Sequence, residues 1–272
     1  MCITDPIFLY NGLYSTKVTI KGELEMNRDD LLLLFVLFFT YSLMGWIWEC
    51  IFESVINHKI LNRGFLTGPY IPIYGFAGLI YYNFFQRFQS EVFISYNTLY
   101  VFIGGIFIAT IAEYVTSYVL EKFLHARWWD YSDYPLNLNG RICVIASIFW
   151  GIVTVLIINL VNPKLIVLLN TIDHDIKLIY VSSMTTMFII DLVLTINSIL
   201  DLHNKLRLII SLESLRNVDI KSFLGTYKDR IYKLANPFTR RIVNSFPEMK
   251  FNSKKMQSAL SKLKGIKQDK HK

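Results

Sequence analysis

The sequence predicts an all-α fold, a polytopic transmembrane helical bundle of about five spans with a basic cytoplasmic helical tail. Three observations lead to this prediction. Hydrophobic residues make up 53% of the 272 residues and charged residues 18%, and the mean hydropathy is +0.38, which is too apolar for a soluble domain of this length. Apolar runs of about 20 residues, long enough to cross a hydrocarbon core of roughly 30 Å, recur along the chain. Positive charge is concentrated after residue 200.

The apolar runs define five expected spans at residues 31–52, 66–86, 99–120, 142–162 and 177–200. The first run is too long for a cleavable signal peptide, contains Glu49 and lacks a small-residue cleavage site. We therefore expect a multi-pass protein of the cell membrane, with residues 31–200 forming the transmembrane bundle.

Residues 1–30 form a separate N-terminal leader in this interpretation. Residues 1–25 are polar and irregular, and Met26 stands just before the first apolar run as a more natural start. We expect the first 25 residues to be an upstream extension or a dispensable leader.

Residues 201–272 form the basic tail, with 17 Lys or Arg against 6 Asp or Glu, whereas the first 200 residues carry a net charge of −4. Basic segments stay cytoplasmic, which places the C-terminus inside the cell. The tail lacks aromatic residues interleaved on a defined basic patch, so we expect no nucleic-acid partner. Residues 203–235 predict an amphipathic helix, interfacial or docked beneath the bundle, and a short basic helix is expected after Pro237 and Pro247.

Cysteines and histidines give no sign of a metal, cofactor or disulfide site. Cys2, Cys50 and Cys143 are widely separated, and no two of the five histidines have metal-ligand spacing. We expect no metal and no cofactor.

Small and polar residues recur at every fourth position in three spans. These stripes are Tyr41, Gly45, Glu49 and Glu53 in the first span, Gly105, Ala109, Glu113 and Ser117 in the third, and Cys143, Ser147 and Gly151 in the fourth. Small residues at this spacing allow helix backbones to approach closely in lipid. We therefore expect the three helices to pack together along their stripes, with Glu49 and Glu113 pointing inward.

An ionised side chain at membrane depth costs at least a few kcal/mol unless it is paired or hydrated, so the two carboxylates require partners. Arg63 and Arg141, just beyond span ends on the same predicted side, are the candidates, and Glu53 is a third acid within reach. Two interpretations stay open, namely a buried ion-pair network that fixes the bundle, and a polar cavity that recognises a charged substrate or carries protons. Asp191 is a weaker candidate, since no stripe accompanies it.

The stretch "NRGFLTGPYIPIYGF", residues 62–76, brings poor helix formers to the start of the second span. The expected helix-breaking residues are Gly64, Gly68, Pro69, Pro72 and Gly75. Backbone without helical hydrogen bonds is tolerated at membrane depth only where protein or water satisfies it, and broken helices form ligand sites in transporters for this reason. A kinked, tightly packed helix, or a turn at the interface, is the alternative.

The loop at residues 126–144, "ARWWDYSDYPLNLNGRICV", combines aromatic and polar groups. Trp128 and Trp129 are typical of the headgroup zone of a membrane. Asp130 and Arg141 supply charge, so we expect the loop to form a rigid cap over the mouth of the bundle.

Several consecutive motifs carry a resemblance to a known family. The stretches are "YSLMGWIWECIFES", "NRGFLTGPYIPIYGF", "EYVTSYVLE", "WWDYSDYPLNLNGRICV" and "SIFWG". Together they resemble a bacterial family of ABC-type transporter permeases, the fourth type, over roughly residues 31–163. The resemblance implies a membrane-embedded permease-like subunit and brings neither a substrate nor catalytic residues with it.

The expected function is therefore that of a permease-like subunit in the lipid bilayer. The chain has no G-x-x-x-x-G-K-[ST] motif, so an ABC role requires a separate ATPase, and five spans favour a homo-oligomer or a second membrane subunit. No catalytic motif appears, and we expect no enzyme. The polar-path candidates are Glu49, Glu53, Arg63, Glu113, Asp130 and Arg141. The alternative is a non-transporting membrane protein with an envelope-assembly or regulatory role, in which the same charges only hold the bundle.

Overall fold

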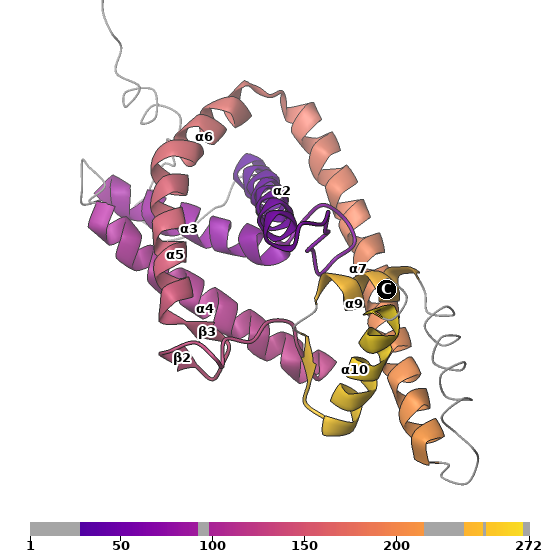
Figure 1. Cartoon of the computed structure of the whole chain (residues 1–272). Coiled ribbons are helices and arrows are strands. Elements are labelled where there is room, and N and C mark those ends of the chain that lie inside the picture. The colour runs from indigo at the N-terminus through magenta and orange to yellow at the C-terminus, as the bar shows by residue number, and fades with distance from the viewer. Residues whose placement is uncertain (1–27, 92–97, 215–236, 247–248, 269–272) are drawn as a thin grey trace, which may run out of the picture.

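The computed structural model describes residues 28–91, 98–214, 237–246 and 249–268 (Figure 1). The expected leader at residues 1–25 and the part of the expected amphipathic helix after Ser214 lie outside this range. The helices are α2 (Arg28–Asn57), α3 (Pro72–Glu91), α4 (Thr98–Leu124), α5 (Val144–Leu156), α6 (Asn162–Thr171), α7 (His174–Ser214), α9 (Pro237–Ser245) and α10 (Lys254–Gln268). The strands β1 (Ala126–Arg127), β2 (Asn137–Leu138), β3 (Ile142–Cys143) and β4 (Lys250–Phe251) have two residues each.

The predicted all-α membrane fold is confirmed. Within the described residues, four helical stretches are long and apolar enough to cross a membrane: Arg28–Asn57, Thr98–Leu124, Val144–Thr171 and His174–Ser211. The remaining long helix, α3, starts at Pro72 rather than at residue 66, because residues 66–71 form no helix. The span count is thus close to the prediction.

Glycine allows α2 and α3 to lie closely against each other, because each glycine leaves room for a side chain of the other helix. A Cβ atom at Gly45 would overlap the ring of Tyr74, and one at Gly75 would overlap the hydroxyl of Ser42. Gly75, expected to break a helix, instead lies inside α3 and serves close packing.

The contact between α4 and α5 is built in the same way. A Cβ atom at Gly105 would collide with Thr154, and the hydroxyls of Thr110 and Ser147 lie 2.9 Å apart across the contact. The stripes of the third and fourth spans therefore pack together as predicted.

The prediction for the stripe of the first span is wrong in its partner. The Tyr41–Gly45–Glu49 side of α2 packs on α3, because the Tyr74 ring covers Gly45. The three stripes thus meet through α3 rather than directly.

A π-helical turn, Ile157–Val161, joins α5 to α6 and makes them one long crossing. Pro163 follows at the start of α6, and proline and π-turns are the usual causes of irregularity within a helix. The next residue after the turn, Asn162, is buried, and its Oδ1 accepts a 2.6 Å hydrogen bond from the Tyr41 hydroxyl. This bond ties the α5–α6 crossing to α2.

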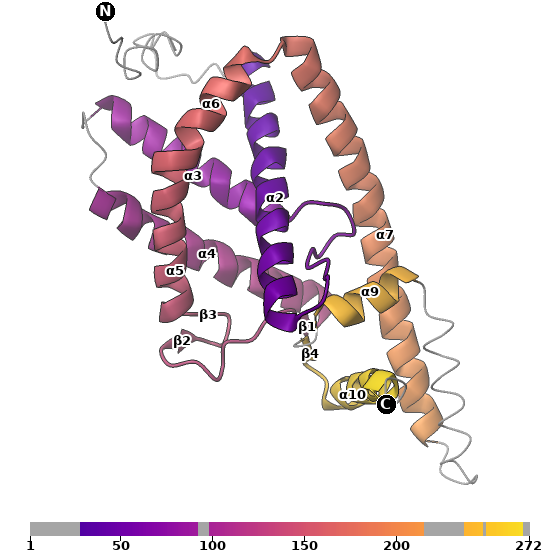
Figure 2. The ribbon, with the colours of Figure 1, turned by 45° about the horizontal axis from the view of Figure 1, so that its top comes forward.

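The largest hydrophobic core lies where α9, β4 and α10 pack against α7 and the loop after α4 (Figure 2). Its buried residues are Ala126, Trp128, Ile199, Leu202, Leu206, Ile209, Ile242, Val243, Phe246, Met249, Phe251, Ala259 and Leu260. Strand β4 pairs antiparallel with β1, with Ala126 opposite Phe251. We call residues 237–268 the tail segment. The end of the bundle that the tail segment covers is called the tail side.

Helix α7 continues without interruption across residue 200, where the sequence places the limit of the bundle. Its 41 residues correspond to about 60 Å at 1.5 Å per residue, roughly twice the thickness of a hydrocarbon core. The tail segment packs on this helix, as Figure 2 shows.

Candidate functional site

The chain after α2 turns back into the bundle before α3 begins. Residues 60–71 form no helix, and the amide of Ile71 donates a 3.0 Å hydrogen bond to the carbonyl of Ser42. Ser42 lies 15 residues before Asn57, the end of α2, which is about 22 Å along a helix axis. The irregular segment, residues 60–71, therefore reaches well into the bundle.

The backbone of the irregular segment obtains hydrogen bonds from side chains, as membrane depth requires. The Oδ1 atom of Asn62 accepts hydrogen bonds from Trp46 Nε1 at 2.9 Å and from the Gly64 amide at 3.1 Å. The side-chain Nδ2 of Asn62 donates to the carbonyl of Thr67 at 2.9 Å. Asn62 thus braces the segment from inside.

Asp191 of α7 supplies the strongest acceptor. Its Oδ1 accepts a 2.9 Å hydrogen bond from the Thr67 amide, and its Oδ2 a 2.7 Å bond from the Gly68 amide. The residue is only 6% exposed. The sequence ranked Asp191 as a weak candidate because it lacks a small-residue stripe. Its shortest hydrogen bonds come from backbone amides, which no side-chain pattern reveals, and the hydroxyl of Thr195, one turn further along α7, donates to Oδ1 at 3.4 Å.

Arg241 of α9 holds the other half of the segment. Its Nη1 donates to the carbonyl of Gly64 at 2.8 Å and its Nη2 to the carbonyl of Phe65 at 3.0 Å. Burial lowers the pKa of Arg241, and the negative charge of nearby Asp191 opposes this change. The segment is therefore held between an acidic side chain from the bundle and a basic one from the tail segment.

Two carboxylates lie at either side of an aromatic pair inside the bundle. The hydroxyl of Tyr74 donates to Glu49 Oε1 at 2.6 Å, and the indole Nε1 of Trp150 donates to Glu113 Oε1 at 2.5 Å. The rings of Tyr74 and Trp150 meet edge to face, with centroids 5.5 Å apart. Helices α2, α3, α5 and α4 thus each contribute one residue to a chain that runs from Glu49 to Glu113.

The second oxygen of Glu113, Oε2, is buried and has no hydrogen-bond partner among the described residues. Tyr131 lies within the field of the same carboxylates, since burial raises its pKa and the charges of Glu113 and Glu49 add to this effect. We call Glu49, Tyr74, Trp150 and Glu113 the carboxylate–aromatic cluster. Both acids face a common centre, as the stripes predict.

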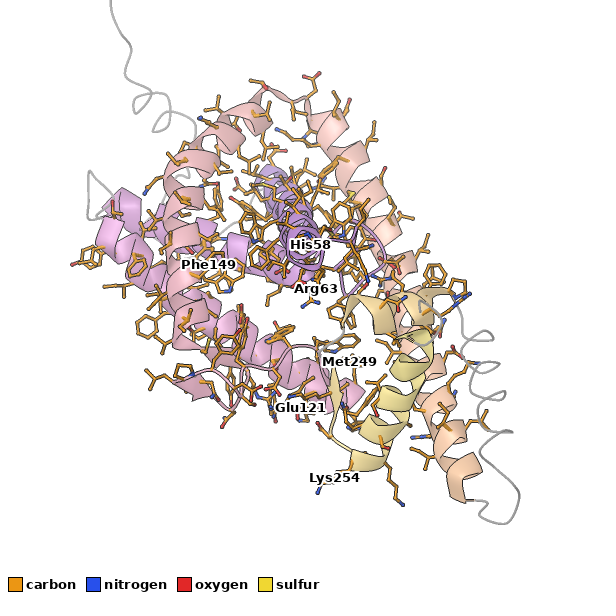
Figure 3. All side chains as sticks on the ribbon, in the orientation of Figure 1. His58, Arg63, Glu121, Phe149, Met249 and Lys254 are labelled. Atoms are coloured by element: carbon orange, nitrogen blue, oxygen red, sulfur yellow. The ribbon has the colours of Figure 1, made fainter. Side chains whose placement is uncertain are left out.

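The predicted partners of these acids are corrected. Arg63 forms an ion pair with Glu53 at 3.3 Å and donates to the carbonyl of Ser245 at 2.8 Å, rather than pairing directly with Glu49. Glu53 is one turn closer than Glu49 to the end of α2 that Arg63 follows. The Arg63 side chain therefore pairs with Glu53. Figure 3 shows Arg63 between that end and the tail segment that carries Met249.

Arg141 likewise pairs with Glu121, at 2.7 Å, and not with Glu113. Glu121 also accepts a 2.9 Å hydrogen bond from Arg127, and it lies at the end of α4 in Figure 3. Glu121 was not among the predicted site residues, although it stands four residues after Ser117 and so continues the stripe of this helix. Extending the stripe by one position would have found it.

The loop at residues 126–144 is fixed to the tail segment rather than to a lipid headgroup zone. Trp128, expected in that zone, is 3% exposed and packs edge to face on Phe65 and Phe246, with centroids 4.9 Å away in both cases. The reason is that the tail segment covers this tryptophan.

Asp130 binds the tail segment from the outer side of the same loop. Its Oδ2 lies 2.6 Å from Lys250 Nζ, and its Oδ1 accepts hydrogen bonds from Ser132. Burial raises the pKa of Asp130, but these hydrogen bonds outweigh burial and lower the pKa to about 2. Asp130 therefore belongs to the tail contact and not to the carboxylate–aromatic cluster.

The described part of the chain contains no group of three or more His, Cys, Asp or Glu that could hold a metal ion. The helix-breaking residues divide by position: Gly64, Gly68 and Pro69 lie in the irregular segment, and Pro72 begins α3.

These features define a helical membrane protein with paired carboxylates in its bundle and an irregular segment beside them. A family model described as "Putative ABC-transporter type IV" matches residues 36–196, more than half of the 272 residues, and the chain belongs to this family. The resemblance noted in the sequence is thereby confirmed. No curated protein and no solved structure matches the chain. The matched region includes Glu49, Glu113 and Asp191 and ends before Arg241.

Proposed function

We propose that the chain is the membrane-embedded, permease-like subunit of an ABC-type transport system. Membership of the family supports an ABC-transporter type of protein. The observation that carries the proposal is the carboxylate–aromatic cluster, in which Glu49 and Glu113 are joined through Tyr74 and Trp150 inside the bundle. Ionisable residues at membrane depth are expensive and mark substrate or ion pathways in most membrane proteins.

The irregular segment supports the same function. Its start is fastened by Arg241 and its middle by Asp191, and it reaches the depth of Ser42. Non-helical backbone at this depth is a feature of transporter binding sites, where it offers amides and carbonyls to a ligand. In our proposal the segment and the carboxylate–aromatic cluster flank the path of the substrate.

The energy source in this proposal is a separate ATPase. The 272 residues contain no P-loop motif that could hold ATP. The net positive charge after residue 200 supports a cytoplasmic tail segment, which would then lie on the side where an ATPase binds. A second copy of the chain, or a second membrane subunit, would complete the path, since a bundle of this size has few helices with which to enclose one.

A specific observation favours a second candidate, a non-transporting membrane protein with a role in envelope assembly or regulation. Four of the six predicted polar residues make contacts that fasten loops or the tail segment: Glu53 with Arg63, Arg141 with Glu121, and Asp130 with Lys250. These pairs need no substrate to explain them. In this candidate Glu49 and Glu113 only hold helices together, through their hydrogen bonds to Tyr74 and Trp150.

The decisive experiment is affinity purification of the tagged full chain from native membranes, with identification of the proteins that accompany it. Recovery of a P-loop ATPase in stoichiometric amount is the expected result. Repeated recovery of a partner without any ATPase would instead support the assembly role.

Complementation of a deletion strain separates the candidates by residue. Glu113→Gln keeps the size of the side chain and removes its ability to ionise, so it should abolish activity while the protein still inserts. Asp175→Asn, at an exposed position near the start of α7, is the matched control and should retain activity. Normal activity of Glu113→Gln would remove the carboxylate–aromatic cluster from the mechanism.

A further inference from the structure

The tail segment makes direct polar contact with the irregular segment inside the bundle. Arg241 donates to two consecutive carbonyls, those of Gly64 and Phe65, and the neighbouring residue Arg63 donates to the carbonyl of Ser245. The contact is thus reciprocal, because each segment provides an arginine for the backbone of the other. Residues that are far apart in the sequence are joined here by three hydrogen bonds of 2.8 to 3.0 Å.

Helix α9 is itself held firmly on α7. The hydroxyl of Thr239 donates to the carbonyl of Ser198 at 3.1 Å and to Asp201 Oδ2 at 2.9 Å. Ile242 and Val243 are buried in the hydrophobic core of the tail side. A displacement of α9 would therefore reach the irregular segment through Arg241 as a movement of a folded unit.

On the opposite side, Asp191 grips the segment only two residues further along. The carbonyls of Gly64 and Phe65 and the amides of Thr67 and Gly68 belong to neighbouring peptide groups. A short non-helical stretch has no i to i−4 hydrogen bonds that could restore its shape after one side is released. The two side chains therefore determine its conformation together with Asn62, which binds the Gly64 amide and the Thr67 carbonyl from within the segment.

We propose that Arg241 and Asp191 are positioning residues through which the tail segment sets the shape of the irregular segment. A partner that binds the tail segment then changes the backbone beside the carboxylate–aromatic cluster without touching the bundle. The role of this coupling in transport rests on the proposed function, with the ATPase as the partner. The coupling itself is a property of the isolated chain and is tested without a substrate.

The test is hydrogen–deuterium exchange of the full-length chain in lipid nanodiscs, followed at the amides of Thr67 and Gly68. Arg241 does not contact these amides, which are bonded to Asp191. In Arg241→Gln we expect both amides to exchange about tenfold faster. Without the Arg241 hydrogen bonds to Gly64 and Phe65, the segment opens more often at its hydrogen bonds to Asp191. Amides in the middle of α4 should exchange at the wild-type rate.

Arg240→Gln is the matched control, since this arginine is the neighbour of Arg241 on α9 and makes no hydrogen bond to the described part of the irregular segment. It should leave the exchange of Thr67 and Gly68 unchanged. Equal acceleration in both variants would show a general effect of charge on the tail segment and would overturn the proposal.

Arg241→Lys provides the test if Arg241→Gln detaches α9 from α7 altogether. Lysine keeps the positive charge and can hold one carbonyl, but it lacks the fork that binds two. We expect α9 to stay protected in this variant while Thr67 and Gly68 exchange faster than in the wild type, though less so than in Arg241→Gln. Protected α9 with unchanged exchange at both amides would refute the coupling.

The reciprocal variant, Asp191→Asn, extends the test in the other direction. It should accelerate exchange at Thr67 and Gly68 directly, and at Gly64, which Asp191 does not touch. Unchanged exchange at Gly64 would contradict the proposal that Asp191 and Arg241 act together on the conformation of the irregular segment. The proposed function fails separately, through the absence of an ATPase in purification or normal activity of Glu113→Gln, so the two failures are distinguishable.

Discussion

The hydroxyl of Tyr74 donates a 2.6 Å hydrogen bond to Oε1 of Glu49, and the ring of the same tyrosine lies against Gly45, one turn earlier on α2. One side chain of α3 therefore holds the carboxylate in place and sets the distance between the two helices. The absence of a side chain at Gly45 is what allows the ring to lie there. Packing and polar chemistry are joined at this position.

Tyr74→Phe tests the polar half of this relationship. The substitution preserves the ring and removes the donor to Glu49, and leaving a buried group without its partner costs about 1–3 kcal/mol. We expect a lower thermal unfolding midpoint in nanodiscs and reduced complementation. Tyr134→Phe, at an exposed residue, is the control and should match the wild type. An unchanged midpoint for Tyr74→Phe would show that the bond contributes little to stability.

Asp191→Ala should be among the most destabilising substitutions in α7. It leaves the half-buried amides of Thr67 and Gly68 without an acceptor, and an amide that loses its partner away from water costs up to about 1–3 kcal/mol. Thermal unfolding with the intact chain in nanodiscs measures the effect. Asp175→Ala, on the exposed first turn of the same helix, should change the midpoint little, and a loss of similar size there would contradict the assignment.

Gly105→Leu should separate α4 from α5. A Cβ atom at this position already overlaps Thr154, and an overpacked contact costs typically about 1–3 kcal/mol. We expect a lower unfolding midpoint and weaker protection of both helices in hydrogen exchange. Val115→Leu, on an exposed face of α4, adds a methylene group without meeting a neighbour and should have no such effect.

Acid should weaken the contact between Asp130 and Lys250. The folded-state pKa of Asp130 is lowered to about 2 from 3.8, so its contribution to stability is fully present above pH 3.8 and is lost as the pH falls through about 2. The unfolding midpoint of the wild type should exceed that of Asp130→Asn at pH 5, and the difference should shrink towards pH 2. A difference that stays constant between pH 5 and pH 2 would exclude this linkage.

The sequence predicts the helical membrane fold well, because composition and run length are properties that each span carries by itself. The four-residue stripes also place Glu49 and Glu113 towards a shared centre, since small residues mark the faces on which helices approach. Both predictions depend on local properties of the sequence, which are independent of how the chain folds back on itself.

Contacts between residues far apart in the sequence are not visible in local patterns. Asp191 binds backbone amides, and Arg241 binds backbone carbonyls across 177 positions in the sequence, so no pattern of side chains marks either contact. The two arginines were assigned to the deep acids because only the ends of the spans were considered. Trp128 was assigned to the lipid interface because its burial depends on the tail segment, which is distant in the sequence.

The lateness of the tail segment in the chain has a consequence for biosynthesis. Among the described residues, every helix long and apolar enough to cross a membrane precedes Pro237, so these helices can enter the bilayer before α9 leaves the ribosome. Until then the carbonyls of Gly64 and Phe65 lack their hydrogen bonds from Arg241, and the indole of Trp128 lacks its contact with Phe246. We therefore expect maturation in two stages, in which insertion of the long helices comes first and closure of this end of the bundle by the tail segment follows.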